Sequence, residues 1–294
     1  MVILITIVLV CTSALMLQCT AAPPTTKGSS LSGSITISGS TTIQPVNELL
    51  AKAFHKNNTG VIVNVQGGGS GKGMTDVGEK LVDIGSASEQ IPQSIMQKYP
   101  GIVVTQIGAS AVVPIVNVQD NVNSINVDDL KKLYDNKQVE KPAAFKDFTV
   151  YKRAETSGTA DTWSTYLFGD KSTVYDAVGT IGATGNPGVV DGVASAPKSI
   201  GFADFGFAEN NPRVKIIGIT DGKNSYPAAT RENMLKVLKK TDTSLYPAGL
   251  TRPLNYITNG KPTPLVQAYI DYVLSPGAVW AFDKNGYFSM QEVK

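Results

Sequence analysis

Three short polar turns carry the residues of this chain that could hold a ligand. They lie at residues 39–45, 67–73 and 157–159, and each combines glycine with serine or threonine. Glycine lets the backbone approach a ligand closely, and the hydroxyl groups add hydrogen-bond donors. Arg153, four residues before the third turn, adds a planar fork of donors that suits an oxyanion. The chemistry indicated is the capture of a small oxyanion by many hydrogen bonds.

The glycine-rich second turn departs from two catalytic motifs. A P-loop would need a glycine five places before Gly71, where Gln66 stands, and a serine or threonine where Gly73 stands. A nucleophile elbow around Ser70 would need a glycine in place of Lys72. Neither nucleotide binding nor serine hydrolysis is therefore predicted at this turn.

The counts of histidine, cysteine and charge exclude other chemistries. His55 is the only histidine, which excludes a multi-histidine metal site, and its place at the far end of an expected helix is wrong for a catalytic triad. Cys11 and Cys19 both lie in the first twenty residues, so the body of the chain has no thiol nucleophile, zinc ribbon or disulfide. The net charge of +2 is too small to indicate a basic surface that binds a nucleic acid.

Each polar turn is expected between a strand and a helix. Alternating polar and apolar residues predict a strand over 34–38, and apolar residues at helical spacing predict a helix over 46–54. Strands over 61–65 and 82–85 follow, with a helical stretch between them, which implies a parallel sheet with right-handed crossovers. Ligands bind beyond the carboxyl ends of such strands, where helix N-termini add partial positive charge.

Further along the chain, two separate strands are expected over 103–107 and 111–118. A helix is expected over 127–134, and strands over 200–205 and 214–219. Val266, Tyr269, Ile270, Val273 and Leu274 predict a late amphipathic helix.

The N-terminus reads as a targeting segment. The first 26 residues hold no charged side chain, and residues 2–10 are a solid apolar run. We expect residues 1–22 to be a signal, lipoprotein or membrane-anchor segment and residues 23–34 a tether. Residues 15–19 resemble a lipobox with Cys19 as the lipid attachment site, although Gln18 stands where a small residue is usual. Lipid attachment, an uncleaved anchor and ordinary cleavage stay open, and all three place the body outside the cytoplasmic membrane.

A set of segments resembles, in order and spacing, the substrate-binding protein of phosphate ABC transporters. They cover roughly residues 35–290 and are GSTTIQP, VQGGGSGKG, VDIGSAS, RAETSGT, SIGFADFGFA and the late LTRPLNYITNGKP…YIDYVLSP…GY run. The resemblance implies an α/β, two-lobed type II periplasmic-binding-protein fold, each lobe a mostly parallel sheet flanked by helices. Lobe 1 would be residues 35–113 plus 250–294 and lobe 2 residues 114–249, with crossings near residues 113–114 and 250–253.

The resemblance also implies that phosphate is held dry in the cleft between the lobes. The implied ligand residues are Thr41, Thr42, Ser70, Ser88, Arg153, Ser157, Gly158 and Thr159. Thr41 would give its hydroxyl, Thr42 its backbone N–H, and Glu155 could hold the guanidinium. Ser88 stands where the phosphate-specific pattern D-x-G-x-x-D often has an aspartate, which accepts the proton of hydrogen phosphate and repels sulfate. A serine discriminates less, so the selectivity stays open, with Glu89 as an alternative acceptor.

The function predicted is high-affinity extracytoplasmic binding of inorganic phosphate and its delivery to an ABC permease with a cytoplasmic ATPase, by a monomer. Binding of sulfate, molybdate or tungstate would use the same turns, and a phosphate-sensing surface module would lack the permease. A secreted phosphohydrolase is the enzyme alternative, against which the lone histidine and the lack of metal ligands argue. We therefore expect no catalysis, cofactor, metal or nucleic acid.

Overall fold

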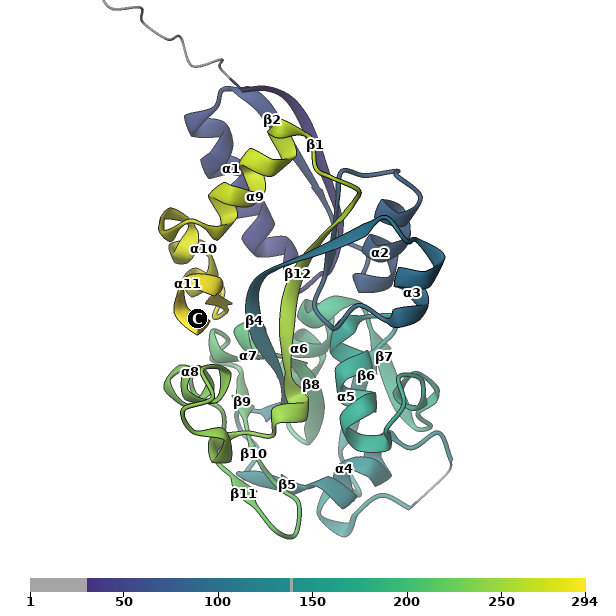
Figure 1. The fold of residues 1–294 in the computed structure, drawn as a ribbon. Helices are drawn as coiled ribbons and strands as arrows, with labels where there is room; N and C mark the ends of the chain where they lie inside the picture. The colour runs from purple at the N-terminus through teal and green to yellow at the C-terminus, as the bar shows by residue number, and fades with distance from the viewer. Residues whose placement is uncertain (1–30, 138–139) are drawn as a thin grey trace, which may run out of the picture. The chain divides into compact units, whose positions relative to one another are not determined.

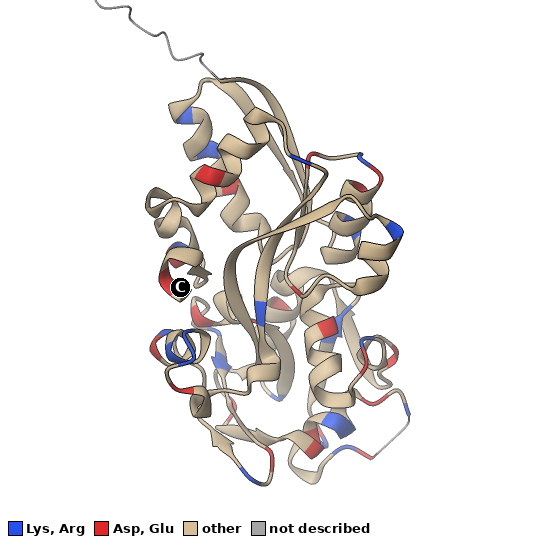
Figure 2. Cartoon of the chain, in the orientation of Figure 1, with Lys and Arg blue, Asp and Glu red and all other residues tan. Residues whose placement is uncertain are grey.

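The structure is a computed structural model, and it describes residues 31–137 and 140–294. The expected targeting segment, Cys19 and most of the expected tether lie outside the described residues. Among the described residues, no helix is both long enough and apolar enough to cross a membrane. Figure 2 shows acidic and basic residues interspersed along the ribbon, without a stripe of one sign in this view.

A curled sheet runs through the described chain in the order β2-β1-β3-β12-β4-β8-β6-β7. The strands are β1 (Ser32–Gly39), β2 (Gly60–Gln66), β3 (Ile84–Ala87), β4 (Ile102–Asn117), β6 (Thr149–Arg153), β7 (Thr180–Ala183), β8 (Ser199–Asp204) and β12 (Thr251–Asn259). The strands β2, β1 and β3 are parallel, and so are β8, β6 and β7. Between these two sets run β4 and β12, antiparallel to each other (Figure 1).

The fold has two lobes, joined by β4 and β12 (Figure 1). The first lobe holds β1–β3 with α1 (Gln44–Asn57), α2 (Ser70–Gly78), α3 (Gln93–Lys98), α9 (Pro264–Leu274) and α10 (Val279–Lys284). The second holds β6–β8 with α4 (Val127–Tyr134), α5 (Gly158–Phe168), α6 (Gly185–Ser195), α7 (Phe205–Glu209) and α8 (Arg231–Leu238). Short elements complete them: β5 (Ser124–Asn126), β9 (Val214–Ile216), β10 (Gly218–Thr220), β11 (Ser225–Tyr226), β13 (Phe288–Ser289) and α11 (Met290–Val293).

Each lobe has its own apolar core. In the first, Ile35 and Ile37 of β1 are fully buried in one cluster with Val46 and Leu50 of α1. Strand alternation places Tyr256 of β12 in that cluster and its neighbour Ile257 in a separate cluster beside α2. The sheet of the first lobe is therefore covered by helices on both faces.

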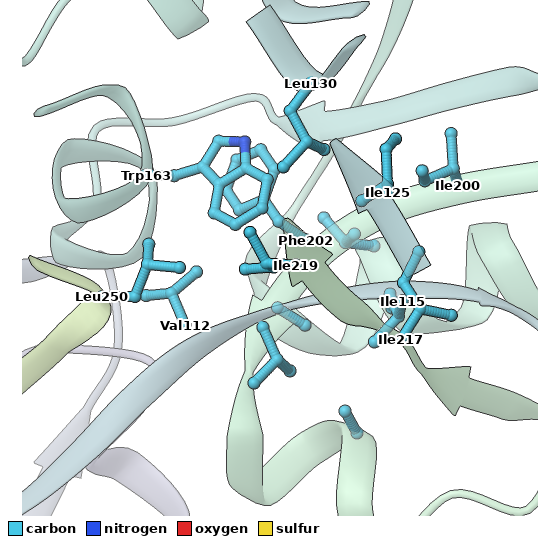
Figure 3. Close-up of a cluster of buried hydrophobic side chains, with 14 of the residues drawn as sticks. Val112, Ile115, Ile125, Leu130, Trp163, Ile200, Phe202, Ile217, Ile219 and Leu250 are labelled. Carbon is cyan, nitrogen blue, oxygen red and sulfur yellow. The ribbon is translucent and has the colours of Figure 1, made fainter. Parts of the chain in front are cut away.

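The core of the second lobe is built around aromatic rings (Figure 3). Trp163 of α5 stacks on Phe202 of β8 with ring centroids 5.1 Å apart, and Tyr134 of α4 meets Trp163 edge-on at 5.9 Å. Leu250, just before β12, packs into the same core. This packing fixes α5, and with it the polar turn at the N-terminus of α5.

Most elements expected near the polar turns are confirmed. The first strand, the helix after it and the second strand are present as β1, α1 and β2, and the helix over 127–134 is α4. The expectation of separate strands over 103–107 and 111–118 is wrong, because β4 is one continuous strand. It stays continuous because its middle residues pair with β12 on one side and with β13 on the other.

Candidate functional site

The three polar turns meet where the two lobes face each other. From the first lobe, Thr42 precedes α1 and Ser70 begins α2, and from the second lobe Thr159 lies in the first turn of α5. The hydroxyl oxygens of Thr42 and Thr159 are 3.4 Å apart across the lobes. A Cβ on Gly158 would lie 2.9 Å from Ser70 Oγ, so the two helix N-termini touch. The structure thus brings together turns that are up to 117 residues apart in the chain.

Ser88, just after β3, lies inside this cluster of hydroxyl groups. Its oxygen accepts a hydrogen bond from Ser40 Oγ at 3.1 Å and is 3.5 Å from Ser70 Oγ, and its backbone N–H donates to Ser70 Oγ at 3.1 Å. Ser40 Oγ in turn accepts from the backbone N–H of Thr42 at 3.2 Å, so this N–H is already engaged within the turn. All of these side chains are buried.

Arg153 ends β6 and is only 1% exposed. Its Nη2 donates to Thr41 Oγ1 at 3.1 Å, which joins the second lobe to the first, and it also pairs with Glu155. Its Nη1 is buried and has no hydrogen-bond partner. Burial lowers the pKa of the Arg153 guanidinium and the nearby charge of Arg252 lowers it further, while Glu155 opposes both. A buried donor of this kind is ready to meet an anion.

Sequence reasoning missed a second buried arginine at the site, Arg252 of β12. Its Nη2 donates to Thr42 Oγ1 at 3.1 Å and Thr159 Oγ1 at 3.0 Å, and its Nη1 donates to the carbonyl of Ser88 at 2.9 Å. Its charge is paired with Asp204 at the end of β8. Part of the signal was present in the sequence, because Asp204 ends the apolar run of β8 and a buried charge requires a partner.

Asn186, near the start of α6, is a second site residue that the sequence did not predict. Its Nδ2 donates to Thr42 Oγ1 at 3.0 Å, and its Oδ1 accepts from the backbone N–H of Asp204 at 3.0 Å. No local pattern marks this residue, because its role depends on where the fold places α6.

Close backbone approach explains the glycines of the second turn. Gly69 has φ of +91°, and a Cβ there would lie 2.3 Å from the carbonyl oxygen of Thr156 in the other lobe. Gly73 touches β1 and β3, since a Cβ would lie 2.6 Å from the carbonyl of Ser86. The first position lets the lobes close, and the second seats α2 on the sheet.

Glu89 does not join the hydroxyl cluster. Its carboxylate pairs with Lys171 at 2.5 Å, and Lys171 also lies 3.5 Å from Asp161 of α5. These three residues line a neighbouring pocket of about 290 Å³, which shares Arg252 with the cluster. Burial raises the pKa of Glu89 to about 7, and the charge of Asp161 contributes in the same direction. The structure therefore gives no support to Glu89 as the acceptor for a bound anion.

The described residues contain no group of three or more His, Cys, Asp or Glu side chains placed to hold a metal ion. The described residues do form a buried cluster rich in hydrogen-bond donors, at which three helix N-termini and two guanidinium groups lie.

Comparison with known proteins identifies the family of this chain. The model of the PBP superfamily domain matches residues 24–276. The chain belongs to the PBP superfamily. Among curated proteins, it is 28% identical to the phosphate-binding protein PstS of Bacillus subtilis over 83% of this chain and 76% of that protein.

Solved structures show the same fold. A putative phosphate ABC transporter substrate-binding protein with bound phosphate from Clostridium perfringens has a TM-score of 0.73 and 21% identity, covering 88% of this chain and all of that one. An ABC-type phosphate transport receptor from Vibrio cholerae has a TM-score of 0.67 and 22% identity, covering 86% of this chain and 99% of that one. The expected two-lobed type II periplasmic-binding-protein fold is confirmed by these likenesses.

Proposed function

We propose that this protein binds inorganic phosphate outside the cytoplasm and delivers it to an ABC permease. The observation that carries the proposal is the free, buried Nη1 of Arg153 beside three converging polar turns. The relatives named above as phosphate-binding proteins support the choice of phosphate. The proposed ligands are the eight residues Thr41, Thr42, Ser70, Ser88, Arg153, Ser157, Gly158 and Thr159.

Binding is electrostatic and involves no bond cleavage. A dianion that leaves water loses its hydration, and only a nearly complete set of donors offsets that cost. A micromolar scavenger needs a net binding free energy of roughly −8 kcal/mol. Closure of the lobes removes water and strengthens each hydrogen bond. The closed, loaded form then differs from the open form in shape, which is what a permease can recognise.

The proposed lobes are residues 35–113 plus 250–294 and residues 114–249. Two distinct cores support this division: the first draws on residues between 35 and 107 and between 254 and 287, and the second almost entirely on residues between 111 and 250. The chain crosses between them on β4 and again on entering β12.

We also propose that residues 1–22 export the chain and hold it at the outer face of the cytoplasmic membrane, with Cys19 as the lipid attachment site. The uncharged, apolar N-terminus supports export. The mass of the mature N-terminal peptide distinguishes the outcomes, because a lipid on Cys19, an intact Met1 and an unmodified internal N-terminus have different masses.

The test is a calorimetric titration of the full-length chain, purified in mild detergent and dialysed against a phosphate-consuming enzyme mixture. Phosphate is expected to bind with a micromolar or lower Kd, and Arg153→Lys is expected to weaken it by at least about 100-fold, because lysine cannot form the planar fork. The control is Arg213→Lys, a surface arginine paired with Asp191, which should bind as the wild type does. Absence of phosphate binding, or tighter binding of molybdate or tungstate, contradicts the proposal.

Delivery is tested separately from binding. Cells that lack this chain are expected to take up radiolabelled phosphate more slowly at micromolar concentration, and the restored gene is expected to recover uptake. Unchanged uptake, with phosphate binding intact, favours a phosphate-sensing module. Release of product from a chromogenic phosphate ester would favour the phosphohydrolase.

A further inference from the structure

The hydroxyl groups of the cluster already accept hydrogen bonds from the protein, so their own protons are directed to other acceptors. Thr41 Oγ1 accepts from Arg153 Nη2, and Ser70 Oγ accepts from the backbone N–H of Ser88. Two more hydroxyls are engaged in the same way, Thr42 by Asn186 and Arg252, and Ser157 by the backbone N–H of Ala160. Each of these hydroxyls therefore has its proton available for a bound anion, and the shell around the anion is rich in donors.

A shell of donors suits an ionised oxygen but not a P–OH group. At neutral pH every form of inorganic phosphate carries at least one proton on oxygen, whereas sulfate carries none. Enclosing a P–OH without an acceptor leaves a buried donor unsatisfied, which is costly. A site with this shell alone would favour sulfate, so phosphate selectivity requires one free acceptor.

Glu155 supplies such an acceptor. Its Oε1 accepts from the Nε of Arg153 at 3.1 Å and from the backbone N–H of Gly185 at 3.0 Å. Its Oε2 is buried without a hydrogen-bond partner, although the side chain as a whole is 29% exposed. In the part of the chain that the structure describes, it is the only buried carboxylate oxygen in this state. Nη1 of Arg153, on the guanidinium that pairs with this carboxylate, is likewise buried and unpaired.

The other buried carboxylates near the cluster are engaged. Asp204 Oδ1 accepts from Ser110 Oγ at 2.8 Å and from the backbone N–H of Gly206 at 3.1 Å, and its Oδ2 pairs with Arg252. Glu89 pairs with Lys171 in the neighbouring pocket. Asp161 accepts from the hydroxyl of Tyr175 at 2.6 Å.

We propose that Glu155 Oε2 accepts the hydrogen bond of the P–OH group while Arg153 Nη1 donates to a neighbouring oxygen of the same ion. Glu155 is then the residue that selects hydrogen phosphate over sulfate. This inference rests on the proposed phosphate binding and adds the origin of its selectivity. It gives the chain a proton acceptor although Ser88 stands where an aspartate is often found.

The test is Glu155→Gln, compared with the wild type by calorimetry with phosphate and with sulfate. Glutamine keeps an oxygen for Arg153 and Gly185 but places N–H donors where Oε2 was. In the wild type, phosphate should bind about 10⁴-fold more tightly than sulfate, as for sites built around one substrate hydroxyl. In the variant, phosphate should weaken by about 10- to 100-fold while sulfate binds more tightly, so that the ratio collapses.

The matched control is Glu89→Gln, which makes the same change in the carboxylate that pairs with Lys171. It should leave the phosphate-to-sulfate ratio unchanged, and a collapse of the ratio in this variant would assign selection to Glu89 and overturn the inference. An unchanged ratio in Glu155→Gln, or equal binding of both anions by the wild type, overturns the role of Glu155 while leaving phosphate binding intact. Absence of phosphate binding by the wild type overturns the proposed function itself.

A second measurement does not depend on whether Glu155→Gln folds. In a crystal structure of the wild type with phosphate, Glu155 Oε2 should lie about 2.5–2.7 Å from one phosphate oxygen, as in a hydroxyl–carboxylate hydrogen bond. A separation beyond about 4 Å would exclude that hydrogen bond and with it the inference.

Discussion

Arg252 and Asp204 form a buried ion pair that joins β12 to the end of β8, and the same guanidinium donates to a threonine from each lobe. Asp204 is fully buried and Arg252 is 4% exposed. The pair thus holds the hydroxyls of Thr42 and Thr159 at the point where the lobes meet. Because Asp204 balances the charge of Arg252, the charge left for an incoming anion comes mainly from Arg153 and the helix N-termini.

Removing one partner of this pair should destabilise the fold strongly. Asp204→Asn keeps the shape of the side chain but leaves the Arg252 charge buried and uncompensated, which costs about 3–5 kcal/mol. Urea denaturation monitored by circular dichroism measures the change in the free energy of unfolding. The control is Asp191→Asn, whose partner is Arg213 in a pair exposed on both sides, and it should cost less than about 1 kcal/mol. An equal loss of unfolding free energy in the two variants would show that the buried pair stabilises the fold no more than the exposed pair does.

Ser157 has two roles that a matched control separates. Its hydroxyl caps α5 by accepting from the backbone N–H of Ala160 at 3.1 Å, and it is also a proposed phosphate ligand. Ser157→Ala should therefore lower the free energy of unfolding by about 1 kcal/mol and weaken phosphate binding by at least about 10-fold. Thr230→Ala removes the comparable cap of α8, where Thr230 accepts from Asn233 N, so it should cost similar stability and leave phosphate affinity unchanged. Wild-type affinity in Ser157→Ala would remove this residue from the ligand set.

Closure of the lobes should depend on the missing side chain of Gly69. In Gly69→Ala the new methyl group would lie 2.3 Å from the carbonyl of Thr156 in the other lobe, so the closed form must open or shift. Phosphate should then dissociate at least about 10-fold faster, because affinity changes within one interface fall mostly on the off-rate. Stopped-flow fluorescence of the tryptophans would report it.

Gly260→Ala is the control for backbone strain. Gly260 has φ of +88°, close to the +91° of Gly69, but a Cβ there meets nothing within 4 Å. Both variants should lose about 1–3 kcal/mol of stability from the strained backbone, and only Gly69→Ala should change the dissociation rate. Faster dissociation in both would point to general loosening of the protein.

Much of the first lobe could be predicted because its signals are local. Strand alternation before residue 39, the Pro45 helix start and the glycine turn after residue 66 each occupy a short window. The sequence predicts two strands where the structure has β4, because Gly108 to Ser110 are weak strand formers. Only pairing with β12 and β13 carries the strand through them.

The site was predictable in outline and not in its connections. The hydroxyl turns and Arg153 are recognisable by residue type, and the family resemblance predicts that they share one ligand site. The contacts of Arg252 and Asn186 span 210 and 144 residues, respectively, in the chain, so only the folded sheet brings them to Thr42. Glu89 shows that closeness in sequence does not guarantee a place in the site. It is adjacent to Ser88, yet its side chain pairs with Lys171 outside the hydroxyl cluster.

The raised pKa of Glu89 makes the stability of the protein depend on pH. Burial raises this pKa from 4.5 to about 7, the charge of Asp161 adds to the rise, and Lys171 opposes it. Between these two values the folded protein holds a proton that the unfolded chain has released. The free energy of unfolding contributed by Glu89 therefore falls as the pH rises from about 4.5 to about 7, by up to about 3 kcal/mol, and is flat above that.

Glu89→Gln cannot titrate, so the difference in unfolding free energy between wild type and variant isolates this contribution. We would measure the free energy of unfolding by urea denaturation at pH 5, 6, 7 and 8. The value for the wild type minus that for the variant should fall by about 1–3 kcal/mol between pH 5 and pH 7 and stay level above pH 7. Glu232→Gln is the control, because Lys236 lowers the pKa of the exposed Glu232 and places its titration below this range. Its difference from the wild type should stay constant from pH 5 to pH 8. A difference for Glu89→Gln that is equally constant would mean that Glu89 is ionised throughout, with Lys171 outweighing burial.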